Sequence, residues 1–224
     1  MPAMRALLID LDGVLRRWES DNARLAESVG RLLAGAIQRA AFDPALLGPA
    51  ITGRVPDHEW RRRVVARLNL TYSEADAQRA VELWSASVGA LDERIVSLVR
   101  RVRSRARVVL VTNATSRLAA DLVRLGLAGA FDAVVNSSEV GAAKPDAAIF
   151  HAALQVAGVT PQAATLVDDS ATHVAAAEIL GIVGHTYRDA AALTAHLCRY
   201  GLLAPSGGDE DLQGASRLLD AATD

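Results

Sequence analysis

Short apolar runs recur along the chain, and most of them precede a segment whose apolar residues have helical spacing. Near-continuous runs of this kind are typical of strands buried on both faces, which occur in parallel sheets. Strands are expected at residues 6–9, 108–111, 133–135, 164–167 and, as the weakest pattern, 182–183. Helices are expected at residues 92–102, 116–125, 147–157, 171–180 and 190–197. This alternation predicts an α/β fold with a doubly wound parallel sheet as its core.

One region breaks the alternation of strands and helices. Residues 17–89 have helical spacing throughout, with breaks expected at Asp43-Pro44, Gly48-Pro49 and Val55-Pro56. A segment of roughly 70 residues is too long for a plain loop. We therefore interpret 17–89 as an inserted all-helical lobe and residues 1–16 plus 90–204 as the core. Residues 205–224 start with Pro-Ser-Gly-Gly, continue acidic, and are expected to form a C-terminal tail.

Composition excludes several classes of protein. A formal net charge of −2 argues against general nucleic-acid binding, which usually leaves a basic excess. The apolar run before Asp10 is too short for a signal peptide or a membrane span. Cys198 is the single cysteine, which excludes an intrachain disulfide and fits a reducing compartment. We expect a cytoplasmic protein with no nucleic-acid or membrane partner, and its oligomeric state stays open.

Acidic side chains follow two of the expected strands. Asp10 and Asp12 come directly after residues 6–9, and Asp168 and Asp169 come directly after residues 164–167. Ligands of open α/β sheets bind beyond the carboxyl ends of the strands. Carboxylates gathered there repel one another unless a cation separates them, and Mg²⁺ prefers oxygen ligands. Taken alone, Asp12-Gly13 also suits a turn, and Asp169 also suits a helix cap.

Two further motifs suit an anion. Thr112 and Asn113 end the expected strand 108–111, where a hydroxyl and free backbone amides at a helix start can bind phosphate. Lys144 opens a later helix, and a lysine near phosphate supplies a compact positive charge. Each motif alone also has a plainer interpretation, capping by Thr115 or Ser116 and a surface lysine. Together, the motifs are expected to converge on one crevice of the sheet.

This ordered set resembles the haloacid dehalogenase-like (HAD) superfamily over about residues 5–199. The segment 10–14 is similar to the first motif of the superfamily, Thr112 to the second, Lys144-Pro145 to the third and Asp168-Asp169 to the fourth. The resemblance implies a Rossmann-like core. It also implies that the helical segment after the first motif is a C1-type cap, because one helix and one strand already fill the stretch between Thr112 and Lys144.

The resemblance also implies a role for each motif residue. Asp10 would attack phosphorus and form an aspartyl-phosphate, while Asp12 would act as general acid and then as general base. Thr112 and the backbone amides near Asn113 would hold the phosphoryl oxygens, and Lys144 would offset charge. The implied function is a Mg²⁺-dependent phosphatase acting on a small phosphorylated metabolite. The implied ligands of Mg²⁺ are the carboxylate of Asp10, the backbone carbonyl of Asp12, the carboxylate of Asp169 and, directly or through water, Asp168.

His173 departs from a common pattern of the superfamily, in which many relatives have asparagine at this position. The resemblance places the position beyond the direct metal ligands. We interpret His173 as a solvated helix residue rather than as a catalytic base.

Other functions remain open on the same core. A 2-haloacid dehalogenase is disfavoured by Asp12, because such relatives lack an acid at this position and need no magnesium. A phosphomutase is not excluded by the motifs, since the difference depends on how the cap excludes water. A non-catalytic binding protein is disfavoured because no motif residue is missing. The residues expected to contact substrate, each of which also suits packing or solvent exposure, are Arg16, Trp18 and Arg54, with Arg17, His58 and Trp60 as further candidates.

Overall fold

The computed structural model describes residues 5–204, and its centre is a five-stranded parallel sheet in the order β5-β4-β1-β6-β7. Strand β1 lies in the middle, with Ile9 opposite Leu110 on one neighbour and Val167 on the other. The predicted α/β parallel-sheet fold is confirmed. The strands are β1 (Ala6–Ile9), β4 (Arg107–Thr112), β5 (Ala133–Asn136), β6 (Ala164–Asp168) and β7 (Val183–Thr186).

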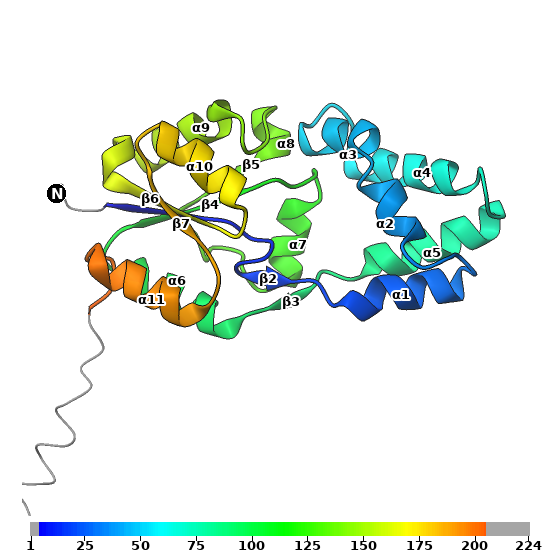
Figure 1. Cartoon of the computed structure of the whole chain (residues 1–224), viewed down its shortest axis with the longest axis horizontal. Coiled ribbons are helices and arrows are strands. Elements are labelled where there is room, and N and C mark those ends of the chain that lie inside the picture. Colours follow the sequence, from blue (N-terminus) through cyan, green and yellow to red (C-terminus); the bar gives the residue numbers. More distant parts are fainter. Residues whose placement is uncertain (1–4, 205–224) are drawn as a thin grey trace, which may run out of the picture.

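Helices cover both faces of this sheet (Figure 1). Successive residues of a strand point to opposite faces, so Leu7 and Ile9 of β1 enter one apolar cluster while Ala6 and Leu8 enter the other. The first cluster includes residues of α6 (Glu93–Val102), α7 (Leu118–Arg124) and α11 (Ala190–Arg199). The second includes residues of α9 (Ala147–Ala157) and α10 (Ala171–Ile179). The strands are apolar on both faces because helices pack against both faces of the sheet.

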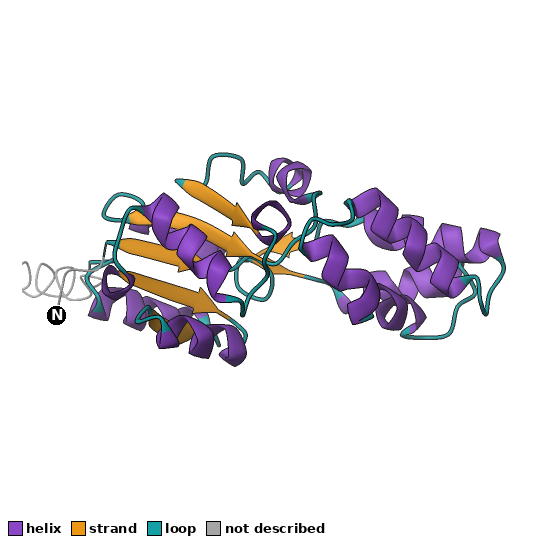
Figure 2. Ribbon diagram, turned by 90° about the horizontal axis from the view of Figure 1, so that it is seen from above, coloured by secondary structure: helices purple, strands orange, loops and turns teal. Residues whose placement is uncertain are grey.

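Five further helices form a group beside the sheet, which we call the helical lobe (Figures 1 and 2). Their apolar residues make a cluster of their own around Ile37, Trp60 and Val64. A two-stranded antiparallel ribbon, β2 (Arg16–Arg17) and β3 (Ala90–Leu91), joins the lobe to the sheet. The lobe helices are α1 (Ser20–Val29), α2 (Ala36–Ala41), α3 (Pro44–Ile51), α4 (Asp57–Leu68) and α5 (Glu74–Ala86).

The predicted break at Gly48-Pro49 is wrong, because α3 runs through Pro49 to Ile51. The side chain of Asp43 accepts a hydrogen bond from Ala45 N at the start of this helix, and Thr52 Oγ1 donates to Gly48 O at its end. These side-chain bonds satisfy backbone groups at both ends, and the short helix tolerates the missing N–H of proline. The other two breaks coincide with helix starts, at Pro44 and directly after Pro56.

Three small elements had no signal in the sequence: the β2–β3 ribbon, the short helix α8 (Ser137–Val140) and a 3-10 turn at Pro161–Ala163. No helix within residues 5–204 is long and apolar enough to cross a bilayer. The predicted tail at 205–224 lies outside the described residues, as do residues 1–4.

Two histidines stack at the β7 edge of the sheet. The rings of His185 and His196 have centroids 4.4 Å apart, and His196 Nε2 lies 2.8 Å from Thr165 Oγ1. Because Thr165 donates its own proton to Val183 O, the His196 nitrogen is the donor in this contact. Burial lowers the pKa of His196 to about 4, and the neighbouring charges of His185 and Arg199 act in the same direction. The folded protein therefore favours a neutral His196 ring.

We expect His196 to make the protein acid-sensitive. Its pKa is lower in the folded state than in the unfolded chain, so its contribution to stability is complete above about pH 6.5 and is lost between about pH 6.5 and 4. After allowance for solvent screening of a half-buried ring, the loss should be about 1 kcal/mol. Urea unfolding of wild type and His196→Gln at several pH values measures it. The exposed His151→Gln variant should keep the wild-type dependence, and an unchanged dependence in His196→Gln would contradict the assignment.

Candidate active site

A buried ammonium group joins two carboxylates at the carboxyl edge of the sheet. Lys144 Nζ lies 2.9 Å from Asp10 Oδ1 and 2.6 Å from Asp168 Oδ2, and it donates to Val111 O at 2.9 Å. A lysine has three N–H donors, so these three acceptors use its full capacity. The side chains of Lys144 and Asp168 are fully buried, and that of Asp10 nearly so. The structure thus places Asp10 and Lys144 in direct contact.

Burial and charge act against each other in this cluster. Burial, reinforced by the charge of Asp168, raises the pKa of Asp10 to about 6 even though Lys144 lowers it. For Lys144, burial disfavours the charge, but the charges of Asp10 and Asp168 outweigh it and raise the pKa of the ammonium. For Asp168, burial is outweighed by hydrogen bonds and by the Lys144 charge, so its pKa is lowered. Lys144 therefore stays charged between the carboxylates of Asp10 and Asp168, whose pKa values shift in opposite directions.

Asn113 fixes the backbone of the lysine. Its Oδ1 accepts from Lys144 N at 2.7 Å, and its Nδ2 donates to Lys144 O at 2.9 Å. The side chain of Asn113 is therefore committed to Lys144, which leaves its backbone amide for an anion. Thr112 is buried at the end of β4, the strand next to β1.

His173 contacts a site residue, which corrects its interpretation as a solvated helix residue. Its Nδ1 lies 3.0 Å from Asp168 Oδ1, and its side chain is 22% exposed. The same Asp168 oxygen accepts from Ser170 N at 2.9 Å. Both oxygens of Asp168 are therefore engaged by protein donors. The signal was present in the sequence, since His173 lies in the first turn of the helix that follows Asp168.

Three carboxylates form a set that can hold a cation. Oxygens of Asp10, Asp168 and Asp169 lie within 4.8 Å of one another. Asp169 is the most exposed of the three, and burial together with the charge of Asp168 raises its pKa. A cation here would offset the repulsion between these groups, and an all-oxygen set suits a hard cation such as Mg²⁺. Because Asp168 is already bonded to protein donors, Asp10 and Asp169 are the better placed direct ligands.

Gly13 brings the first motif against Asp169. Its φ is +78°, and a Cβ atom at this position would overlap Asp169 Oδ2. A side chain at this position would therefore displace the carboxylate, in addition to straining the backbone. The glycine that suggested a simple turn is thus a packing requirement of the candidate cation site.

Asp12 lies apart from the lysine cluster. Its carboxylate accepts hydrogen bonds from Arg16 and Trp18, and its side chain is 38% exposed. All three residues line a cleft of about 840 Å³ between the sheet edge and the helical lobe. Two of the three predicted substrate-contact residues, Arg16 and Trp18, therefore lie at the cleft and also contact Asp12.

The cleft has an aromatic lining with both basic and acidic residues. Besides Trp18, it includes Trp60 and Trp84 from the lobe, with Arg61 and Arg117. Trp60 packs edge-on against Trp84, with ring centroids 5.8 Å apart. Other predicted contacts lie elsewhere: Arg17 pairs with Asp92, Arg54 is exposed and bonds Thr52 Oγ1, and His58 is exposed and outside the cleft lining.

Residues 4–181 match the sequence model of the haloacid dehalogenase-like hydrolase family. The chain belongs to this family. The resemblance drawn from the four motifs is thereby confirmed, and the protein is an enzyme of the hydrolase class. In this chain, Asp10 and Asp168 lie at the ends of β1 and β6, and Lys144 lies in the segment between α8 and α9.

Two curated relatives share part of the sequence. The phosphoglycolate phosphatase of Chromobacterium violaceum is 39% identical over 94 residues, which are 40% of this chain and 42% of the relative. The pyrimidine 5'-nucleotidase YjjG of Escherichia coli is 45% identical over 64 residues, 28% of each chain. Each match spans less than half of the relative's length.

Solved structures share the fold. The HAD family enzyme bt-2542 from Bacteroides thetaiotaomicron, in complex with magnesium and inorganic phosphate, aligns with a TM-score of 0.67 at 21% identity. The alignment covers 83% of this chain and 94% of that enzyme. The sheet and the helical lobe together therefore follow a known arrangement of the HAD fold.

The composition of the chain carries a further signal for the site. Lys144 is the only lysine among the 24 Lys and Arg residues of the sequence. A chain that uses arginine at every other basic position retains a lysine where a compact charge must be fully buried. Arginine is planar and carries five donors, so the two residues are not interchangeable in such a pocket.

We expect Lys144→Arg to destabilise the protein. The larger guanidinium would overpack the pocket and leave buried donors without acceptors, lowering the free energy of unfolding by about 1–3 kcal/mol. Urea unfolding measures the change. Arg107→Lys, an exchange of the same residue types at an exposed position, should change it by less than about 0.5 kcal/mol. Equal effects of the two substitutions would show that the pocket accommodates a guanidinium.

Gly13→Ala should weaken cation binding. A methyl group would push the Asp169 carboxylate out of the set, so Mg²⁺ should raise the melting temperature less than it does in wild type. Gly141→Ala is a matched control, because Gly141 has a similar φ of +82° but open space around its Cβ position. That control should lose stability through backbone strain yet keep the wild-type response to Mg²⁺. A normal response in Gly13→Ala would contradict the proposed cation site.

Proposed function

We propose that the protein is a Mg²⁺-dependent phosphatase that hydrolyses a small phosphate monoester through an aspartyl-phosphate on Asp10. One observation carries the proposal: Asp10 is buried against Lys144 and shares the edge of the sheet with Asp168 and Asp169. The curated relatives, a phosphoglycolate phosphatase and a pyrimidine nucleotidase, support phosphate-ester chemistry. The magnesium and phosphate bound by bt-2542 support the same assignment.

The hydrogen bonds of Asp10 select the attacking oxygen. Leu11 N donates to Asp10 Oδ1 at 2.8 Å, and Lys144 Nζ contacts the same oxygen. Oδ2 is therefore the oxygen left for attack on phosphorus. A bound Mg²⁺, held by Asp10, Asp169, the Asp12 carbonyl and Asp168 directly or through water, would neutralise charge on the phosphoryl group. Lys144 adds a fixed positive charge on the other oxygen of the nucleophile.

The reaction then has two halves. Asp10 Oδ2 bonds to phosphorus while the ester P–O bond breaks, and Asp12 donates a proton to the departing oxygen. Thr112 and the amides near Asn113 hold the phosphoryl oxygens during this step. In the second half, Asp12 removes a proton from water, which attacks phosphorus and releases phosphate from Asp10.

The cleft supports a small organic phosphate as the substrate. Its volume of about 840 Å³ falls in the ordinary range of small-molecule sites. Trp60 and Trp84 offer apolar surface, while Arg61 and Arg117 lie at the cleft paired with Asp57 and Asp121. We infer that the ester group of the substrate lies against this lining while its phosphoryl group lies at Asp10.

Asp10→Asn should abolish turnover and leave the fold intact. The amide keeps the shape of the side chain but loses its nucleophilicity and its charge toward a cation. Phosphate release from 4-nitrophenyl phosphate, phosphoglycolate and a pyrimidine nucleoside 5'-monophosphate measures the effect, with circular dichroism to check the fold. Retention of more than about a few percent of activity would remove Asp10 from its role.

Chelation distinguishes the alternative chemistries in the same assays. Hydrolysis should stop in excess chelator, and Ca²⁺ should not restore it fully, because Ca²⁺ takes more ligands at longer distances. Full activity without a divalent cation would favour a dehalogenase-type reaction. Transfer of the phosphoryl group to a second hydroxyl instead of water would favour a phosphomutase.

A further inference from the structure

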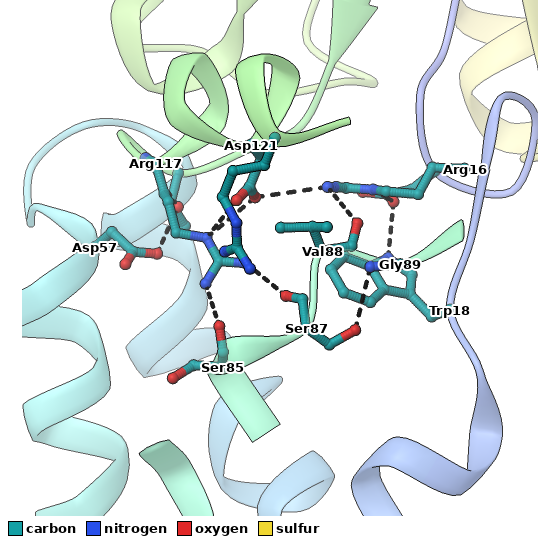
Figure 3. A network of polar contacts seen from close by, with 12 residues as sticks. Arg16, Trp18, Asp57, Ser85, Ser87, Val88, Gly89, Arg117 and Asp121 are labelled. Carbon is teal, nitrogen blue, oxygen red and sulfur yellow. Dashed lines mark hydrogen bonds and ion pairs between the residues drawn. The ribbon is translucent and has the colours of Figure 1, made fainter. Parts of the chain in front are cut away.

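We propose that Arg16 is a positioning residue for the proton-transferring carboxylate of Asp12, and that Asp121 of α7 holds Arg16 in place. The inference rests on the proposed function, in which Asp12 is the general acid and base. It assigns Arg16 a task at Asp12 rather than the substrate contact expected from its position in the sequence. Figure 3 shows the part of the network that links Arg16 to Asp121 and Arg117.

Arg16 donates hydrogen bonds to both carboxylate oxygens of Asp12. Its Nε donates to Oδ1 at 2.7 Å and its Nη2 donates to Oδ2 at 2.8 Å, which is a bidentate pair. Trp18 Nε1 donates to Oδ1 at 2.7 Å. The carboxylate is thereby held in one orientation although its side chain is 38% exposed.

These bonds single out one oxygen for proton transfer. A carboxylate has about four acceptor positions, two on each oxygen. Arg16 and Trp18 occupy both positions on Oδ1, while Oδ2 accepts only the Nη2 bond among the described contacts. The second position of Oδ2 is therefore the one left to carry the proton toward substrate or water.

Arg16 is itself held from several sides. It is only 4% exposed, and its guanidinium carbon lies 4.4 Å from the centre of the Trp18 ring. A Cβ atom on Gly89 would approach Arg16 Cγ to 2.9 Å, so the glycine leaves the space in which Arg16 lies. Arg16 Nη1 also lies 3.5 Å from Asp121 Oδ2 and 3.5 Å from Val88 O. Because these contacts fix Arg16, we infer that Arg16 sets the orientation of the Asp12 carboxylate.

Asp121 connects Arg16, through Arg117, to the segment at the end of α5. It is 6% exposed and lies between Arg16 and Arg117, whose Nε donates to Asp121 Oδ2 at 3.0 Å. Arg117 also donates to Ser85 O at 2.6 Å and to Ser87 O at 3.1 Å. The segment where α5 returns to the core is therefore bonded to the same network that orients Asp12 (Figure 3).

The test compares two substrates that depend differently on a proton donor. An activated aryl phosphate, 4-nitrophenyl phosphate, departs without protonation, whereas the alkyl ester phosphoglycolate needs it. Asp12→Asn should lose about 10²–10⁴-fold in turnover, mainly on the alkyl ester, and should accumulate phosphoenzyme in a rapid quench. Arg16→Met should reproduce this pattern at about 10²-fold, because misplacement of a catalytic group costs that much.

Three further variants refine the comparison. Trp18→Phe and Asp121→Asn each remove one support and should show the same substrate preference with losses of about 10-fold. They also carry the test if Arg16→Met does not fold. Arg16→Lys should recover part of the activity by restoring charge without the bidentate pair. Arg124→Met is the matched control, because Arg124 donates to Ala86 O at the same segment but does not belong to the network around Asp12.

The double variant decides the mechanism. In the Asp12→Asn background, Arg16→Met should cause little further loss, because both substitutions remove the same function. Equal losses on both substrates, a fully additive double variant, or a raised KM with unchanged kcat would overturn the proposal. The proposed function fails separately, if wild type releases phosphate from neither substrate or Asp10→Asn stays active.

Discussion

Asp10 and Asp168 are carboxylates that face each other at the end of the sheet, and the buried ammonium of Lys144 lies between them. Without a shared cation, burying both carboxylates would be strongly unfavourable. The arrangement of the carboxyl edge of the sheet therefore depends on the contact of Lys144 with Asp10 and Asp168. Through it, the loop after β1, the end of β6 and the carbonyl of Val111 in β4 are joined to one nitrogen. Asn113 adds two bonds that fix the lysine backbone.

The helical lobe takes no part in that cluster but forms much of the cleft beside it. Its contacts with the sheet are largely polar. Thr115 Oγ1 donates to Asp57 Oδ1, Asp57 N donates to Ser116 Oγ, and Arg117 bonds the carbonyls that end α5. Thr115 and Ser116 therefore both bond to the lobe, and Thr115 Oγ1 also accepts from Arg117 N at the start of α7. The buried charges of the Lys144 cluster organise the reactive site. The polar contacts between the lobe and the sheet position the cleft in which we expect the ester group of the substrate to lie.

Much of the core could be predicted because buried parallel strands need apolar residues on both faces, as Leu7 and Leu8 illustrate. The motif residues Asp10, Lys144 and Asp168 could be predicted to meet because each follows a strand or opens a helix at one edge. The β2–β3 ribbon could not, since two residues are too few to show a period. Nor could the break at Gly48-Pro49 be read correctly, because caps at either end of α3 outweigh the local signal of proline.

The sequence by itself determined the fold class, the family and the identity of the residues at the strand ends, because periodicity and motif order are properties of the chain. Only the tertiary structure decided how those residues are divided among tasks. In the structure, His173 contacts Asp168 and Gly13 packs against Asp169. Asp12 pairs with Arg16 rather than with Lys144. The contacts of His173 with Asp168 and of Arg16 with Asp12 join residues four or five apart and depend on side-chain direction. The contacts of Gly13 with Asp169 and of Arg16 with Asp121 join segments far apart in the chain. These segments come together only in the folded sheet.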